Sequence, residues 1–454
     1  MRENCTYLYE YYRSGGMKTW LVDRISKQIT VLSVGGFFLF FLSFYQFDTG
    51  IIQYNGNISG TILFLFFLCQ VLTSSYYEIT KYNWYERCQD IYKSIGILDQ
   101  DLTHMRWRDI AYKLVEHGII ENEVMVQCVV TCEDNFIIGL VDRGDIVGEM
   151  FLSEIYVSFL KRCVMEYSNK EGQSKNFAKI CSRYAFISLI LIPYLILYTV
   201  TYSLIKYAIA IYSNPGNLIE MKWTVLGQYK FRHYNELPHE FESRMRSASQ
   251  VMSKFNSLFP SPIVSKLAER LAFIVSEVAI GLILILYFTP HSTTHMFIKV
   301  LTTLILLWSI LDKIIEKKSN KPNPGDVEHD LNDILGHHAY HYHVTLDDKN
   351  KLSRLYKYHM IYALNEFLSI IITPILLIYT SVYRDISISQ FIDSNIRIND
   401  NIGIIYKGTE FNVQDMNEMT ASKLLQSYHQ YEREYSDSQS IKYSKMLNSR
   451  FMDE

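Results

Sequence analysis

The sequence lacks the motifs that identify several large functional classes. Its 454 residues contain no Gly-Lys-Ser/Thr phosphate-binding loop, no zinc-protease helix and no nucleophile elbow. Acidic and basic residues nearly balance, with a net charge of −3, so no basic excess is available for binding nucleic acid. We therefore expect no nucleic-acid partner, and any transport would be passive or driven by another protein.

The sequence also lacks a disulfide framework. It has seven cysteines, an odd number, at scattered positions, and none follows Cys181. Cys128 and Cys132 are close enough to be two metal ligands, but no second Cys or Cys/His pair follows at zinc spacing. We interpret the cysteines as reduced packing residues: Cys5, Cys69, Cys88, Cys128, Cys132, Cys163 and Cys181.

Charge is scarce as well, and long uncharged runs take its place. Only 20% of the residues are charged, and residues 29–47 and 58–77 contain no charge at all. About 20 such residues cross the hydrocarbon core of a bilayer. Lys and Arg are absent between the two runs but present on both outer flanks, which predicts two spans with cytosolic flanks. The N-terminus does not have the pattern of a cleaved signal, so the first span is expected to act as the signal.

Two further spans are predicted at 271–289 and 297–311, joined by a loop without Lys or Arg. The apolar segment 184–205 is different, because crossing there would place the nine basic residues of 206–270 outside the cytosol. We predict a re-entrant hairpin that is broken near Pro193 or near Asn214-Pro215-Gly216.

The segment 361–383 repeats this pattern around Pro374 and is predicted as a second re-entrant hairpin. Between the membrane segments we expect soluble cytosolic sequence, with a strand in the Val-rich run 124–141. From Glu410 onward the chain is polar and is predicted to be poorly ordered. The predicted organisation is an N-terminal segment 1–28, spans 29–77, a cytosolic domain 78–183, a hairpin 184–214, cytosolic helices 215–270, spans 271–312, a cytosolic segment 313–360, a hairpin 361–383 and a cytosolic C-terminal region 384–454 with a disordered tail.

Polar residues within apolar segments are candidates for function. Glu277 and Glu366 are intramembrane acids, which must face protein or water. The alternatives are that Glu277 serves packing with a neighbouring side chain and that Glu366 lies at the membrane interface. Asn57 begins a glycosylation sequon in the predicted lumenal turn, but it lies close to the membrane. The histidines His337, His338, His341 and His343 are interpreted as a hydrogen-bonded turn in preference to a metal cluster. The 35 tyrosines suit anchoring at the level of the lipid headgroups.

The polar stretch 223–241, WTVLGQYKFRHYNELPHEF, closely resembles the signature of the autophagy-related protein 9 family. Four other segments support the resemblance in order along the chain, which covers roughly residues 7 to 415. They are YYRSGG, LDQDLTHMRWRDIAYKL, SKLAERLAFIVSEVAIGLILILYF and YKYHMIYALNEFLSIIITPILLIY. Relatives place charged residues before the Pro-Gly turn, where this chain has Tyr212-Ser213-Asn214.

The resemblance implies a mainly α integral membrane protein, forming a domain-swapped homotrimer with four transmembrane helices and two re-entrant hairpins per protomer. It implies a phospholipid scramblase of autophagy vesicles, Golgi and endosomal membranes and the phagophore assembly site, which acts in autophagosome assembly without a cofactor. The implied partners are a bridge-like lipid-transfer protein and autophagy scaffold proteins, with tail-borne contacts reduced because both tails are short. By resemblance, the candidates for the lipid path or for trimer contacts lie on a helix beneath the pore: Trp223, Lys230, Arg232, Asn235, Glu236 and Glu242.

Two other functions remain open at this point. An ion or solute channel would use the same pore, but it would need rings of like charge, and none is clear in the sequence. A non-transporting membrane scaffold would recruit lipid-transfer and autophagy proteins through its cytosolic face, with bulky side chains filling the pore.

Overall fold

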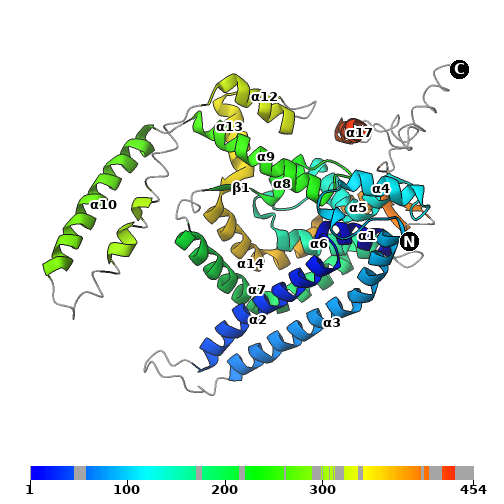
Figure 1. The fold of residues 1–454 in the computed structure, drawn as a ribbon, viewed down its shortest axis with the longest axis horizontal. Coiled ribbons are helices and arrows are strands. Elements are labelled where there is room, and N and C mark those ends of the chain that lie inside the picture. The colour runs from blue at the N-terminus through cyan, green and yellow to red at the C-terminus, as the bar shows by residue number, and fades with distance from the viewer. Residues whose placement is uncertain are drawn as a thin grey trace.

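The computed structural model is mostly helical, and its described residues include two short, two-stranded antiparallel sheets (Figure 1). It describes residues 2–44, 58–169, 176–213, 220–259, 262–288, 298, 300–305, 307–309, 311, 322–335, 341–399, 403–407, 409 and 422–434. The elements up to the first strand are α1 (Arg2–Ser14), α2 (Met17–Phe44), α3 (Ile58–Ser94), η1 (Asp101–Thr103), α4 (Trp107–Glu116), α5 (Glu123–Arg143), η2 (Glu149–Phe151), α6 (Glu154–Ser168) and α7 (Phe177–Ser213). The remaining elements are β1 (Met221–Trp223), α8 (Val225–Phe231), α9 (Pro238–Ser257), α10 (Pro262–Phe288), α12 (Pro324–Leu335), α13 (Leu346–Leu355), β2 (Tyr356–Tyr358), α14 (His359–Tyr383), α15 (Asp385–Asn395), β3 (Ile396–Asn399), β4 (Gly403–Tyr406) and α17 (Ser422–Glu434).

The helix α5 forms the centre of the main core, and the strand predicted at 124–141 is wrong. The Asn122 side chain accepts the Val124 N–H at 3.1 Å and caps the helix, and Gly144 ends it with a positive φ of 69°. The apolar 20-residue window Val124–Arg143 is long enough to cross a membrane, but 78% of it is buried within the protein. Its β-branched residues therefore pack in the core of a helical body, where tertiary packing outweighs their preference for strands.

Tyrosines build much of the core around α5. Tyr9, Tyr11, Tyr85 and Tyr92 are nearly or fully buried, where α1 packs against the end of α3. Their hydroxyl groups find partners; for example, Tyr92 donates to the Leu8 carbonyl at 2.9 Å. Anchoring at lipid headgroups therefore does not explain these tyrosines.

A second hydrophobic cluster joins α9, α12 and α13 to the short β1–β2 ladder. Met221 pairs with Tyr358 and Trp223 with Tyr356, so two segments far apart in the sequence lie side by side. Gly227 is needed here because a Cβ at this position would lie 2.9 Å from the Leu355 carbonyl oxygen. The ladder places the start of α14 beside the segment that follows α7.

The helices α7 and α14 pack as an antiparallel pair (Figure 1). Ser182 near the start of α7 donates to Ser381 near the end of α14 at 3.3 Å. Both helices continue through their internal prolines, so the breaks expected at Pro193 and Pro374 are wrong. Long helical flanks and extensive packing tolerate one missing backbone donor. The alternative break at 214–216 lies outside the described residues.

One face of α14 lies along the body of the protein, while its other face is apolar and exposed. Near its start, Tyr362 donates to Glu154 at 2.8 Å, and near its end Thr380 bonds the Tyr156 hydroxyl at 3.1 Å. The exposed face carries large apolar side chains, including Ile371 and Ile375. Both ends of this apolar helix therefore contact the same body.

Three helices in the described part of the chain are long and apolar enough to cross a membrane: Val124–Arg143, Phe177–Ile196 and Ile361–Tyr383. The predicted spans at 29–47 and 58–77 fall largely within α2 and α3, and the one at 271–289 within α10. Most side chains of the first two runs, and parts of 297–311, lie outside the described residues. Figure 1 shows α10 standing apart from the other long helices.

The C-terminal region is more ordered than predicted. After α14, the helix α15 leads into the β3–β4 hairpin, in which Ile396 pairs with Tyr406. The helix α17 then packs on the body through Leu424, Ser427 and Tyr431, which are all buried. The prediction of disorder from Glu410 is therefore wrong for Ser422–Glu434, because this polar segment has one docking face.

Candidate functional site

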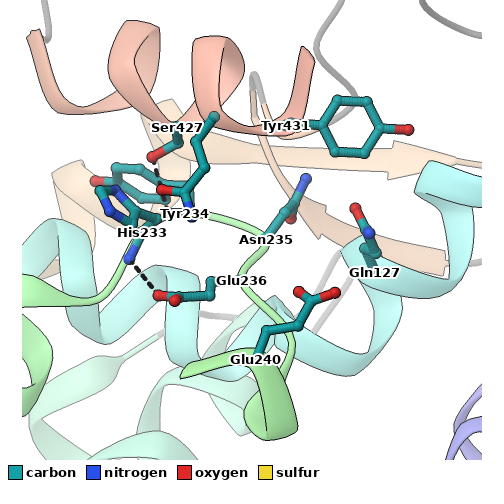
Figure 2. Close-up of a pocket in the computed structure, with 9 residues that line it drawn as sticks. Gln127, His233, Tyr234, Asn235, Glu236, Glu240, Ser427 and Tyr431 are labelled. Atoms are coloured by element: carbon teal, nitrogen blue, oxygen red, sulfur yellow. Dashed lines mark hydrogen bonds between the residues drawn. The ribbon is translucent and has the colours of Figure 1, made fainter. Parts of the chain in front are cut away.

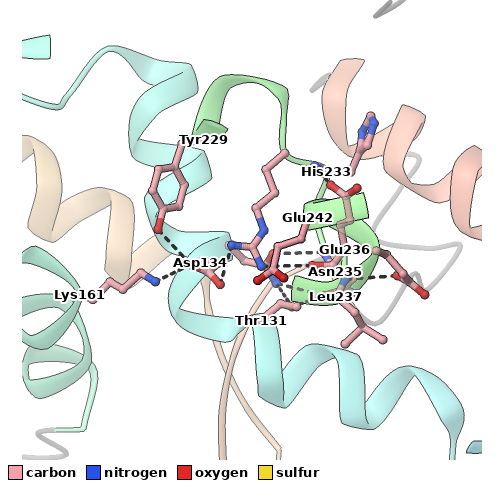
Figure 3. A network of polar contacts seen from close by, with 12 residues as sticks. Thr131, Asp134, Lys161, Tyr229, His233, Asn235, Glu236, Leu237 and Glu242 are labelled. Atoms are coloured by element: carbon pink, nitrogen blue, oxygen red, sulfur yellow. Dashed lines mark hydrogen bonds and ion pairs between the residues drawn. The ribbon is translucent and has the colours of Figure 1, made fainter. Parts of the chain in front are cut away.

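The candidate site is a buried polar network around residues 223–241 (Figure 3). Its first centre is Asp134, on the middle of α5. The Asp134 carboxylate accepts Arg232 Nη1 at 2.8 Å, forms an ion pair with Lys161 on α6, and accepts the Tyr229 hydroxyl at 3.1 Å. One carboxylate thus ties three elements together.

The surroundings keep these groups in the protonation states that the network needs. Burial alone would lower the pKa of the Lys161 ammonium, but the neighbouring Asp134 raises it above its ordinary value. Burial, followed by the charge of Asp134, raises the pKa of Tyr229 to about 12. Near neutral pH, Lys161 is therefore charged and Tyr229 remains a hydrogen-bond donor.

The second centre pairs Glu236 with Arg244 across the turn into α9. Arg244 Nε and Nη2 each reach a Glu236 oxygen at 2.7 Å, which is the two-pronged geometry of a strong Arg–carboxylate pair. Arg244 also donates to the carbonyls of Phe231 at 2.8 Å and Ile334 at 3.1 Å. This pair therefore fixes the loop between α8 and α9 and joins it to α12.

The third centre is Asn235, which has a left-handed backbone with φ of 58°. Its N–H donates to Asn135 Oδ1 at 3.1 Å, and its Oδ1 accepts the Asn135 side-chain amide at 3.0 Å. Its own amide group donates to the Thr409 carbonyl. Asparagine suits this position because it tolerates the left-handed conformation and supplies both donors and an acceptor.

A small pocket lies beside this loop (Figure 2). Its lining comes from α5, from the loop and start of α9, and from α17: Gln127, His233, Tyr234, Asn235, Glu236, Glu240, Ser427, Gln430 and Tyr431. The interface between α17 and the loop is therefore incompletely filled.

The six residues carried over by resemblance do not share one helix, so that expectation is wrong. Arg232, Asn235 and Glu236 lie buried in the loop, and Trp223 is buried in β1. Lys230 on α8 and Glu242 on α9 are exposed, and Glu242 forms an ion pair with Arg13 of α1. Whether any of them contacts lipid or another protomer stays a prediction.

The two intramembrane acids lie in different surroundings. Glu366 on α14 accepts the Glu154 backbone N–H at 3.3 Å, so it faces the body. Glu277 on α10 is exposed among apolar neighbours such as Phe273 and Val278. The structure therefore does not bring these two acids together.

Other candidates are structural where they are described. His343 lies 2.9 Å from Glu328 through Nδ1, and its backbone N–H donates to Asp348, which fits the predicted hydrogen-bonded turn. Cys128 and Cys132 are buried thiols that donate to backbone carbonyls. His337, His338 and Asn57 lie outside the described residues. Among the described residues, no group of three or more His, Cys, Asp or Glu side chains could hold a metal ion.

Sequence reasoning missed the distant half of the network. Nothing local marks Asp134, Asn135 or Lys161 as partners of the 223–241 stretch, and the Val-rich composition of α5 favours a strand. Lys423 lies in a polar segment whose composition predicts disorder. A buried Arg such as Arg232 requires an acidic partner. That requirement is the one signal for an acid such as Asp134.

The network as a whole positions elements instead of reacting with a ligand. Each of its charged groups has an oppositely charged partner: Asp134 contacts Lys161 and Arg232, and Glu236 contacts Arg244. These pairs fix the geometry of the loop. The fold and this site define a helical protein in which a rigid polar body carries apolar helices of membrane length.

Comparison with known proteins assigns the family. The family model described as autophagy protein ATG9 matches residues 145–412, more than half of the chain. This chain belongs to the ATG9 family. Autophagy-related protein 9 of Kluyveromyces lactis is 26% identical over 365 residues, covering 76% of this chain and 39% of that protein. Autophagy-related protein 9A of Bos taurus is 28% identical over 259 residues, covering 54% of this chain and 29% of the relative.

The fold agrees with that assignment. The cryo-EM structure of Schizosaccharomyces pombe Atg9 is similar with a TM-score of 0.68 at 20% identity, covering 90% of this chain and 98% of that one. The chain spans about half or less of the length of the curated relatives first matched. It is thus a protein of an autophagy family with the Atg9 fold.

Proposed function

We propose that this protein is a passive phospholipid scramblase that moves lipids between bilayer leaflets while autophagosome membranes grow. The proposal rests on membership of the ATG9 family, and the observation that carries it is the two-sided helix α14. One face of α14 is apolar and exposed, whereas its opposite face carries Glu366 and buried hydroxyls such as Thr373 and Thr380. A helix of this kind presents polar groups at the depth of lipid tails.

The physical basis is the cost of moving a headgroup through hydrocarbon. A polar or charged headgroup pays several kcal/mol, about 4–8 for one neutral polar group in an alkane-like medium, if it loses water without gaining partners. A path lined by polar side chains and water lowers that barrier while the tails stay in lipid. Such a path equilibrates the leaflets and needs no coupled energy source.

Both ends of α14 contact the body, which supports a re-entrant position that begins and ends at the cytosolic face. Tyr362 bonds Glu154 near one end, and Thr380 bonds Tyr156 near the other. A helix that crossed the bilayer would carry its two ends to opposite sides. We extend the same placement to α7, which packs along α14.

A homotrimer is part of the proposal, because α10 leaves much apolar surface exposed in the described part of one protomer. It packs against Leu304 and Leu311, but large apolar side chains such as Leu267, Leu271 and Phe273 are exposed along it, and Figure 1 shows it apart from the other long helices. Exchange of α10 between protomers would cover part of that surface. Glu277 would then meet residues of a neighbouring protomer.

We divide the predicted site residues by burial. Lys230 and Glu242 are exposed and are proposed to line the lipid path or contact another protomer. Arg232, Asn235 and Glu236, together with Trp223, are proposed to hold the loop in place. The partners proposed by resemblance are a bridge-like lipid-transfer protein and autophagy scaffold proteins, on vesicles of Golgi and endosomal origin and at the phagophore assembly site.

A non-transporting scaffold is the second candidate, and the ion-paired network favours it. A body whose buried charges hold its own elements together, as Asp134 and Arg232 do, suits a fixed docking platform. The two functions make different predictions for purified protein in liposomes.

The test is dithionite quenching of fluorescent phospholipids in liposomes that contain the full chain. Quenching well beyond the outer-leaflet half, in vesicles that exclude dithionite, supports the scramblase. The variant Glu366→Gln should slow the rate about two- to tenfold if Glu366 lines the path, since it replaces a carboxyl by a weaker, neutral amide acceptor, a loss of about 0.5–1.5 kcal/mol. The exposed Leu364→Ala on the same helix is the matched control and should leave the rate unchanged.

Oligomeric state is measured on the same samples by mass photometry. Quenching that stops at half in vesicles containing intact trimers would overturn the scramblase and leave the scaffold. A rate that Glu366→Gln and Leu364→Ala change equally would remove Glu366 from the path.

A further inference from the structure

The polar helix α17 is held on the body by a buried lysine. Lys423 Nζ donates to Asp142 Oδ1 of α5 at 2.9 Å, and to the carbonyls of Tyr229 at 3.3 Å and Lys230 at 3.1 Å. The Lys423 side chain is only 12% exposed. The ammonium therefore occupies a site formed by one carboxylate and two carbonyls.

A second anchor lies one turn further along α17 (Figure 2). Ser427 Oγ accepts the backbone N–H of Tyr234 at 3.0 Å and donates to the Lys423 carbonyl at 2.8 Å. Leu424 and Tyr431 are buried on the same side, whereas Leu425 is 48% exposed. We call Lys423, Leu424, Ser427 and Tyr431 the docking stripe. The surface beneath it, formed by α5 and residues 229–236, is the receptor surface.

Three observations indicate that this contact is weak enough to open. The helix has 13 residues, a length at which an isolated helix is marginal in water. A pocket remains between α17 and the loop, lined in part by Ser427 and Tyr431. Burial lowers the pKa of Lys423 although Asp142 opposes this, so the ammonium is docked at an electrostatic cost.

We propose that the receptor surface is a helix-docking site with α17 as its releasable occupant. Its replacement would be a partner helix bearing a lysine and, four residues later, a small hydroxyl side chain. The receptor surface itself specifies that pattern. Asp142 and two carbonyls accept an ammonium, and the Tyr234 N–H requires an acceptor one helical turn away. Release of α17 would expose the 229–236 segment to such a partner.

Hydrogen–deuterium exchange of the full chain in detergent tests the release. The amide of Tyr234 is the reporter, because its acceptor belongs to α17. Lys423→Glu places a carboxylate against Asp142 and should raise exchange in α17 and at Tyr234 by about tenfold or more, since a buried pair becomes a repulsion. Leu425→Gln is the matched control on the exposed side and should change neither.

A labelled synthetic peptide spanning residues 420–436 tests whether a separate helix can replace α17 on the receptor surface. It should bind the Lys423→Glu chain saturably in fluorescence anisotropy and restore protection at Tyr234. The wild-type chain, whose own α17 competes at high effective concentration, should bind it at least about tenfold more weakly. A peptide that itself carries Lys423→Glu should not bind.

Two results would overturn the proposal. One is a Tyr234 amide that Lys423→Glu leaves protected, which would mean that α17 does not cover the receptor surface. The other is a peptide that binds wild type and Lys423→Glu equally, or restores no protection. Neither readout involves lipid transport, so failure here and failure of the scramblase assay are distinguishable.

Discussion

The network around Asp134 and the outer face of α14 differ in which side chains are buried. The network buries charged side chains, whereas the outer face of α14 exposes apolar ones. In the network, charged side chains are withdrawn from water, and each has an oppositely charged partner. On α14, large apolar side chains such as Ile375 and Ile378 are left exposed, while hydroxyls such as Thr373 and Thr380 turn inward. A water-soluble body would gain nothing from the second arrangement.

The two regions have different roles: the network maintains the fold, and the exposed face of α14 suits the surrounding solvent. The network fixes the position of the 232–237 loop, because each partner left alone would be a buried charge costing several kcal/mol. The exposed face of α14 is stable where the surroundings are lipid. One region therefore holds the fold rigid, and the other matches the body to a membrane.

The largest expected effect comes from removing the acid at the centre of the network. Asp134→Asn leaves Arg232 and Lys161 as uncompensated buried cations, so unfolding should become easier by about 3 kcal/mol or more. Thermal unfolding of the detergent-solubilised chain, followed by tryptophan fluorescence, measures the loss.

The matched control for that variant is Asp109→Asn, which breaks an ion pair with Arg106 whose partners are 78% and 45% exposed. An exposed pair contributes less than about 1 kcal/mol, so its melting temperature should hardly move. Equal losses for the two variants would show that burial of the network has no special energetic weight.

The next largest effect is expected at Asn235. Two substitutions there separate the contribution of its side-chain hydrogen bonds to stability from that of its backbone conformation. Asn235→Ala loses the side-chain bonds to Asn135 and Thr409 and also strains the left-handed backbone, for a total of about 3 kcal/mol. Asn235→Gly loses the same bonds but tolerates the positive φ, and should cost about 1 kcal/mol less. If Asn235→Ala and Asn235→Gly lower the melting temperature equally, backbone strain plays no part at this site.

Sequence alone located the 223–241 stretch and the apolar segments, because both are local patterns. It misplaced α5, since Val-rich composition favours strands, while the Asn122 cap and enclosure by other helices made a helix. The prolines Pro193 and Pro374 predict helix breaks, but both helices continue through them. Packing between α7 and α14 outweighs the one lost backbone hydrogen bond in each helix. Pairs such as Asp134 with Arg232, or Lys423 with Asp142, form only in the folded chain and have no local signature.

A smaller effect is expected where the rigid body meets α14. Tyr156→Phe removes the hydroxyl that bonds Thr380, but Thr380 still donates to the Leu376 carbonyl at 2.8 Å. The loss should be about 1 kcal/mol, and hydrogen exchange should rise along α14 before it rises in α5. Thr380→Val should cost about the same, and the double variant should cost less than the sum of the two. Strict additivity would show that these hydroxyls do not interact.

The smallest effect depends on pH, where α1 meets the start of α9. His239 lies 2.8 Å from the Tyr9 hydroxyl, and burial, followed by the positive charge of Arg13, lowers the pKa of His239 although Glu242 opposes this. The unfolded chain therefore takes up a proton near the ordinary value of about 6.5 before the folded chain does, so stability falls as pH drops below that value. When the pH falls from 7.5 to 5.5, the melting temperature of the wild type should fall further than that of His239→Gln, because glutamine cannot titrate. An identical slope in both proteins would show that His239 is not the group that takes up the proton.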